Sequence, residues 1–166
     1  MKTRFLLIGA AIAALALVQP LGAATATSNV TVAATVAASA KLTLGASTLT
    51  FPDADPETVP SINATEGAVS ITAKARTSAA GAVTLTLLAG GDLTSGANTI
   101  AISNVTWTAS GTGFVAGTMN KTTAQSVGSW TGSGTQTGTA SFKLANSWNY
   151  ATGSYTGSAT YTLTAP

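Results

Sequence analysis

The side chains best able to do chemistry in this sequence are five carboxylates, and three of them fall in one short segment. Asp53-Ala54-Asp55-Pro56-Glu57 holds three, and Glu66 and Asp92 are the other two. A glycosidase needs two carboxylates that flank a bond from two sides, which three groups in one short loop do not naturally provide. The segment could instead offer oxygen ligands to calcium. It lacks the glycine and the spacing of an EF-hand loop, however, and its prolines also fit a solvated connection.

Histidine and cysteine are both absent from the sequence. Nucleophilic triads that use imidazole, thiolate enzymes and the common zinc sites therefore lack their essential groups. We expect a protein that is not an enzyme, and we assign no catalytic residue, no metal ligand and no cofactor.

Aromatic side chains offer a possible binding surface. They are Trp107, Trp130, Trp148, Tyr150 and Tyr155. Such rings could stack on sugars, or they could fill a core otherwise made of small residues. Trp107 shares the phase of Val105, which indicates a core position. Trp130, Trp148 and Tyr150 remain the candidate ligand platform, and Trp130 is the best candidate for exposure because glycine and serine surround it.

The N-terminus has the parts of a secretory signal peptide. A basic start, Met1-Lys2-Thr3-Arg4, precedes an apolar run from Phe5 to Val18, and small residues lead to a cut after Ala24 or Ala26. A retained membrane anchor would need about 20 apolar residues, and Gln19-Pro20 interrupts this run earlier. We expect a signal helix within residues 1–26 that is cleaved off. The mature protein should then be secreted to the periplasm, cell surface or medium, without stable membrane insertion.

Removal of the signal leaves an electrically balanced chain. Seven basic residues minus Lys2 and Arg4 leave five, and five minus five acids gives a net charge of zero. No basic stripe is evident that would bind nucleic acid or an anionic membrane. Only 7% of the residues are charged, against about 25% in ordinary domains. Such a surface is compatible with self-association, because little repulsion separates the copies.

Period-two alternation runs through the mature chain, with apolar residues at every second position and threonine or serine between them. The expected apolar strand positions are Val30, Val32, Ala34 and Val36; Leu42 and Leu44; Leu49 and Phe51; Val69, Ile71, Ala73 and Ala75; Val83, Leu85 and Leu87; Ile100 and Ile102; Val105, Trp107 and Ala109; Ala140, Phe142 and Leu144; and Tyr155, Ala159, Tyr161 and Leu163. The phase slips at Asn104, which a β-bulge or a tight turn would explain. Residues 110–138 are rich in glycine, serine and threonine, and we expect long loops there with one or two weak strands.

Short alternating strands separated by turn residues predict an all-β fold, and helices are disfavoured by the threonine, valine and glycine content. Alternation rather than continuous apolar runs favours an antiparallel sheet. We therefore expect residues 27–166 to form a single antiparallel immunoglobulin-like β-sandwich. A solenoid is a lesser alternative, because no fixed-period repeat is present.

Several segments follow one another in a recognisable order, namely Val30–Val36, Leu49-Thr50-Phe51, Asp55-Pro56, Val69–Ala73 and the terminal Gly153–Leu163. In this order they resemble the spore coat protein U family and related pilin-like β-sandwich domains of bacteria. The resemblance covers about half of the mature chain. The family's cysteines are absent, with Ala40 and Ala73 near their expected places, and the region from Gly111 to Gly138 has no counterpart.

The resemblance implies a subunit that is secreted to the surface and assembled by strand exchange, with a secretion chaperone as a possible partner. The valines Val30, Val32 and Val36 would lie on the donated strand, or on an edge strand if this segment pairs within its own domain. We carry two hypotheses forward. The first is a surface or fimbria-like structural protein that partners itself, and the alternative is a monomeric secreted carbohydrate-binding module.

Overall fold

The computed structural model of the chain describes residues 24–166. The expected signal helix lies outside the described residues, which include only the last three positions of the expected signal peptide. The chain divides into two units, residues 1–34 and residues 35–166. In the first unit, Ala24–Ala34 contain no helix and no strand and are exposed.

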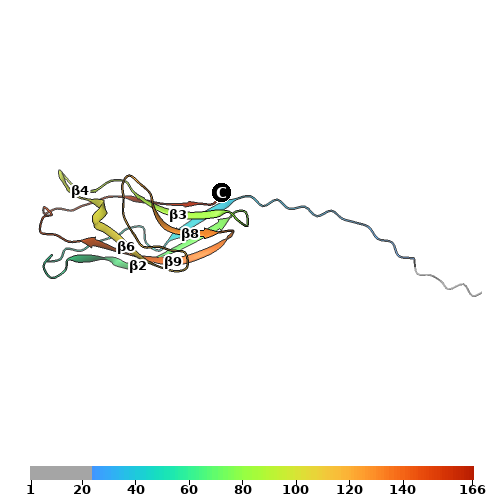
Figure 1. Cartoon of the computed structure of the whole chain (residues 1–166), viewed down its shortest axis with the longest axis horizontal. Coiled ribbons are helices and arrows are strands. Elements are labelled where there is room, and N and C mark those ends of the chain that lie inside the picture. Colours follow the sequence, from blue (N-terminus) through green and yellow to red (C-terminus); the bar gives the residue numbers. More distant parts are fainter. Residues whose placement is uncertain (1–23) are drawn as a thin grey trace, which may run out of the picture. The chain divides into compact units, whose positions relative to one another are not determined.

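The second unit is an all-β domain (Figure 1). Its strands are β1 (Ser39–Leu44), β2 (Ser61–Arg76), β3 (Ala82–Ala89), β4 (Leu93–Ser95), β5 (Asn98–Ile100), β6 (Val105–Ser110), β7 (Gly117–Thr118), β8 (Gln125–Thr131), β9 (Gly134–Ala145) and β10 (Ala159–Thr164). One short 3-10 turn, η1 (Ile102–Asn104), precedes β6.

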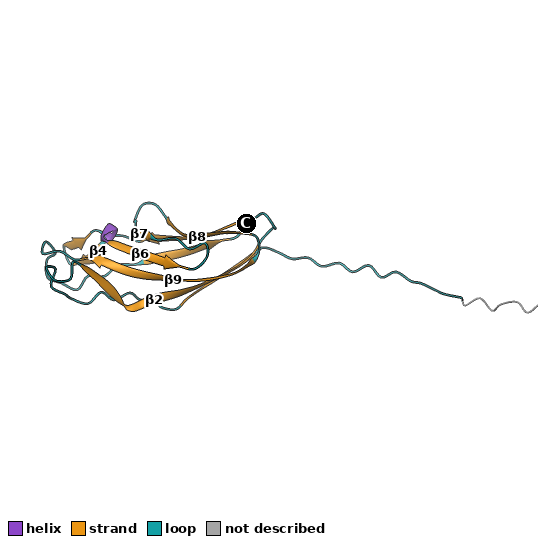
Figure 2. Cartoon of the chain, turned by 60° about the horizontal axis from the view of Figure 1, so that its bottom comes forward, coloured by secondary structure: helices purple, strands orange, loops and turns teal. Residues whose placement is uncertain are grey.

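The strands form antiparallel sheets (Figure 2). A five-stranded sheet has the order β1-β2-β9-β6-β7, a three-stranded sheet has the order β10-β3-β8, and β4 and β5 form a hairpin. The two larger sheets supply one hydrophobic core. β1 and β10 are therefore terminal strands of different sheets, and they lie close to each other.

The core forms because alternation puts one face of each strand inward, as the sequence predicts. On β3, Val83, Leu85 and Leu87 are buried and the threonines between them are not. On β6, Val105 and Trp107 are buried in the same way. The core position predicted for Trp107 is confirmed, since only 2% of its surface is exposed.

The phase slip at Asn104 is explained by a tight turn. η1 ends at Asn104, whose N–H donates to the carbonyl of Ala101 at 3.0 Å. Ile102 remains buried in the turn, and β6 begins one residue after it ends. The turn therefore lets both Ile102 and Val105 face the core.

Two sequence predictions about strands are wrong, and a third is incomplete. No strand forms over Val30–Val36, because alternation shows that a segment can pair but does not supply an edge to pair with. Residues 110–138 contain β7 and β8, in keeping with the one or two strands predicted there, but they also contain the start of the long strand β9, which was not predicted. Leu49 and Phe51 are not in a strand either, but they pack half-buried against the core.

Candidate functional site

The terminal strand β10 leaves one side of its backbone open. Within the described residues, β10 pairs only with β3, in a register that joins Tyr161 to Leu87 and Leu163 to Leu85. β1 likewise pairs only with β2. An unpaired strand edge carries a row of N–H and C=O groups that can bind a further strand.

Apolar side chains along these two strands are incompletely covered. Tyr161 and Leu163 on β10 remain partly exposed, whereas their cross-strand neighbours Leu87 and Leu85 are 1% and 0% exposed. Leu42 and Leu44 on β1 are also only half-buried, although they too pack against the core. The core is therefore less well covered along the β1 and β10 edges than in the middle of the sheets. We call this set, Leu42, Leu44, Tyr161 and Leu163 with the open backbone of β10, the edge site.

The hydroxyl of Tyr161 has no hydrogen-bond partner among the described residues although it is buried. Burial also raises the pKa of this tyrosine to about 12, because the phenolate would lose its hydration. A buried hydroxyl without a partner costs free energy, so the edge site contains an unsatisfied polar group.

Replacing Tyr161 with phenylalanine should therefore stabilise the domain by about 1 kcal/mol at neutral pH. The raised pKa adds a pH dependence, because the unfolded chain loses the phenol proton near pH 10 and the folded chain only near pH 12. Wild-type stability is therefore unaffected by this ionisation below pH 10 and falls as the pH rises from there through about 12. The advantage of Tyr161→Phe should consequently grow above pH 10. Urea unfolding at pH 7 and pH 10.5 measures both effects.

The contrasting variant is Tyr150→Phe. The hydroxyl of Tyr150 donates to the carbonyl of Ala145 at 3.0 Å, so its removal should cost up to about 1 kcal/mol at pH 7. Equal destabilisation by both variants at pH 7 would show that the Tyr161 hydroxyl has a partner after all.

The predicted donor or edge strand lies in an exposed segment that forms no helix and no strand. Val30, Val32 and Val36 are exposed by 85%, 88% and 68%, and residues 24–38 form no strand. We call residues 24–38 the arm. Its valines are exposed apolar groups at alternating positions, which a second strand edge could cover.

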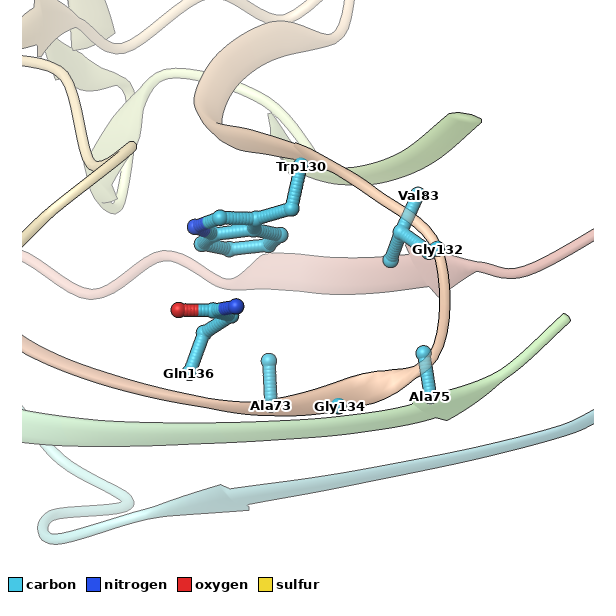
Figure 3. A pocket seen from close by; sticks show the side chains of 7 residues that line it. All are labelled: Ala73, Ala75, Val83, Trp130, Gly132, Gly134 and Gln136. Carbon is cyan, nitrogen blue, oxygen red and sulfur yellow. The ribbon is translucent and has the colours of Figure 1, made fainter. Parts of the chain in front are cut away.

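The predicted aromatic platform does not form as one surface. Trp130 is half-buried at the end of β8, where its indole N–H donates to the carbonyl of Thr112 and its ring meets Phe114 edge-on at 5.0 Å. Figure 3 shows this ring over Gln136. The two side chains line a cavity of about 10 Å³. Such a cavity holds no more than about one water molecule, so it is no sugar pocket.

The other two candidates, Trp148 and Tyr150, follow the opposite end of β9. The Trp130 cavity is lined by Gly134 at the start of this strand, whereas Tyr150 bonds to Ala145 at its end. A strand of twelve residues is about 40 Å long. Trp148 is 73% exposed, and burial raises the pKa of Tyr150. The structure thus leaves Trp148 as the exposed aromatic side chain of the three.

The acidic segment is an ordered turn. Oδ1 of Asp55 accepts a hydrogen bond from the backbone N–H of Glu57, and the side-chain amide of Asn146 donates to the carbonyls of Ala54 and Val59. Asp53, Asp55 and Glu57 are exposed. Between Ala24 and Pro166, no group of three acidic side chains is placed to hold a metal ion.

Sequence reasoning missed the importance of β10 and β1 as terminal strands. Both segments were predicted as strands, but strand order follows from pairing over long distances. A terminal position has no signature in the strand's own residues.

Comparison with protein-family models, with curated proteins and with solved structures finds no match for this chain. Within residues 24–166, no helix has the length and apolar character needed to span a membrane.

Proposed function

We propose that this protein is a secreted, non-enzymatic structural subunit of a bacterial surface or fimbria-like assembly, and that its domain is an immunoglobulin-like β-sandwich. Copies associate when the arm of one copy pairs with the open edge of β10 in another. The supporting observation is the coexistence of an open, poorly covered edge with an exposed alternating segment in one chain.

Chemical complementarity supports strand exchange. The arm can supply main-chain donors and acceptors to β10, while Val30, Val32 and Val36 supply apolar side chains on one face. Those side chains would cover Tyr161 and Leu163, which the domain leaves partly exposed. A secretion chaperone with an exposed strand of its own could cover the same edge before assembly.

Absence of catalysis is supported by the residue types. The sequence has no histidine and no cysteine, and no group of three carboxylates in the described part is placed to hold a metal ion. A structural role requires only surfaces that bind, which the edge site and the arm provide.

Sedimentation velocity of residues 27–166 tests the proposal. Wild type should form oligomers that grow with concentration, and the triple substitution Val30→Thr, Val32→Thr and Val36→Thr should weaken assembly by at least about tenfold, because apolar burial is lost. Val115→Thr is the matched control, since Val115 is 45% exposed but lies outside the arm.

Deletion of residues 26–36 extends the test. The described strands begin at Ser39, so this variant should remain folded by circular dichroism but fail to assemble. A wild-type chain that stays monomeric at every concentration would refute the proposed assembly, as would global unfolding of the deletion variant.

One observation favours the alternative of a monomeric carbohydrate-binding module. Trp148 is exposed on an ordered loop, where an indole ring can stack on a sugar. A monomer that is retained on polysaccharide, and that loses retention in Trp148→Ala, would support this second function.

A further inference from the structure

Three basic side chains gather at one end of the five-stranded sheet. In the register of β1 and β2, Lys41 lies directly opposite Lys74, and Ser39 lies opposite Arg76. All three basic side chains are exposed. Together with Ser39, Ala75, Gly134 and Thr135, they line an open groove of about 350 Å³. We call this set the basic groove.

No carboxylate of the same copy neutralises the basic groove in the described structure. The ion pair found in residues 24–166 joins Lys121 to Asp92, which lie elsewhere in the fold. Like charges directly opposite each other destabilise a strand pair. A groove that keeps two lysines in that arrangement is therefore suited to an anionic partner.

The acidic segment Asp53–Glu57 lies at the other end of the same sheet. It precedes the first residue of β2, Ser61, whereas the basic groove contains the last, Arg76. Between these ends β2 pairs along the twelve residues of β9, from Ser61 opposite Ala145 to Ala75 opposite Gly134, so about 40 Å separates the two. The turn is held in shape by Asn146, and its carboxylates point to no basic partner within salt-bridge distance in the described part.

The two ends are balanced in charge. Seven basic residues minus Lys2 and Arg4 leave five, of which three line the basic groove, and three of the five acidic residues lie in Asp53–Glu57. The mature chain is therefore neutral as a whole, but it carries positive charge at one end of β2 and negative charge at the other. The basic end of one copy attracts the acidic end of another, and ends of like charge repel.

We infer that the basic groove binds the acidic segment Asp53–Glu57 of a second copy, head to tail. The inference rests on the proposed self-assembly and adds a second contact to it. Because the two surfaces differ, each bound pair still presents one basic groove and one acidic segment. Such a heterologous contact continues into an open filament unless the rotation happens to close a ring.

The polarity of strand exchange gives the same arrangement. β10 ends near the basic groove, since the Thr77 hydroxyl, one residue after Arg76, donates to the carbonyl of Pro166. If the arm of one copy (the donor) runs antiparallel to β10 of another copy (the acceptor), the arm ends at the acidic end of the acceptor. The donor chain then continues into its own β1, whose first residue, Ser39, borders the donor's basic groove. The donor's basic groove thus meets the acceptor's acidic segment.

Charge reversal in residues 27–166 tests the contact. At low ionic strength Lys74→Glu should weaken assembly about fivefold to tenfold, and Asp53→Lys, at an exposed position of the acidic segment, should do the same. The two substitutions combined should recover much of the wild-type assembly, because attraction is restored with inverted sign. Lys143→Glu makes the same change in net charge at the acidic end of the sheet, where Lys143 lies opposite Asn63 on β2, and should therefore not weaken assembly.

Zero-length crosslinking by a carbodiimide locates the contact independently of the arm. In a mixture of nitrogen-14 and nitrogen-15 labelled copies, mixed-isotope crosslinks should join Lys41 or Lys74 to Asp53, Asp55 or Glu57. Their absence under conditions where the wild type assembles would overturn the inference.

The possible outcomes separate the two proposals. Assembly that depends on the arm valines but is equally insensitive to Lys74→Glu and Lys143→Glu would refute the charge contact and keep strand exchange. Assembly that responds to the charge swap but not to the valine substitutions would refute strand exchange and keep the charge contact. Loss of binding to a polyuronate in Lys74→Glu, with assembly unchanged, would assign the groove to an acidic polysaccharide instead.

Discussion

Replacing Trp107 with alanine should lower the free energy of unfolding by about 3–5 kcal/mol. This residue is 2% exposed on β6, and its ring lies 6.2 Å from that of Phe142 on β9. Its indole N–H donates to the carbonyl of Val115 at 2.9 Å. Truncation therefore opens a large cavity and also removes the bond that holds the loop before β7.

Total stability of a domain of this size is about 5–15 kcal/mol, so Trp107→Ala should lie near the limit of folding. Urea unfolding followed by circular dichroism measures the loss. Trp148→Ala is the matched control, because that ring is 73% exposed and its removal should change stability by less than about 0.5 kcal/mol. Equal losses in both variants would contradict the central position of Trp107.

Replacing Gly138 with alanine should cost about 1–3 kcal/mol, the range for overpacking. A Cβ at this position on β9 would lie 2.5 Å from the backbone oxygen of Ser110 and 2.5 Å from the ring of Phe114. The backbone of β6 cannot move without disturbing its own pairing with β9, where Ser110 lies opposite Thr139. Strain rather than lost burial is therefore the expected cause.

Gly134→Ala on the same strand provides the comparison. Its Cβ would meet only the side-chain nitrogen of Gln136, at 3.8 Å, which is an ordinary contact. This variant should unfold at about the wild-type temperature, or slightly above it because alanine has the better strand propensity. Thermal unfolding of the two variants side by side distinguishes a clash at Gly138 from a general effect of glycine replacement.

Alternation in the sequence identified most of the core, because burial on one face leaves a period of two. The phase of β3 and β6 could be read from Val83, Leu85 and Leu87 and from Val105 and Trp107. The same rule failed at Val30–Val36, where the period is present but the described segment has no partner strand. Periodicity reports what a strand could bury, whereas pairing depends on an edge elsewhere in the chain.

β8 was hidden by a local irregularity. Its register against β3 shifts between Leu85 and Thr86, which leaves Val127 as an additional residue. Val127 and Gly128 are consecutive and both buried, so alternation is broken there. Gly128 is covered by the Trp130 ring, which a Cβ on the glycine would meet at 2.6 Å. A glycine shielded by an aromatic ring is compatible with a strand, but composition alone indicates a loop.

The candidate sites depended on pairing and were correspondingly harder to predict. Lys41 and Lys74 are distant in sequence and become neighbours only through the register of β1 and β2. Trp130 and Trp148 are closer in sequence, yet the length of β9 separates them. The residue types could be identified in advance, but which of them share a surface could not.

Pairing between β2 and β9 sets a kinetic requirement on folding. Ala75 pairs with Gly134, 59 positions later, and Ile62 pairs with Leu144, 82 positions later. Closing such long loops costs conformational entropy before the favourable contacts between the strands form. Folding should therefore be slow, in the millisecond to second range typical of all-β domains. Newly synthesised chains should therefore spend a measurable interval with both central strands unpaired, and during that interval protection from aggregation has to come from dilution or from another protein.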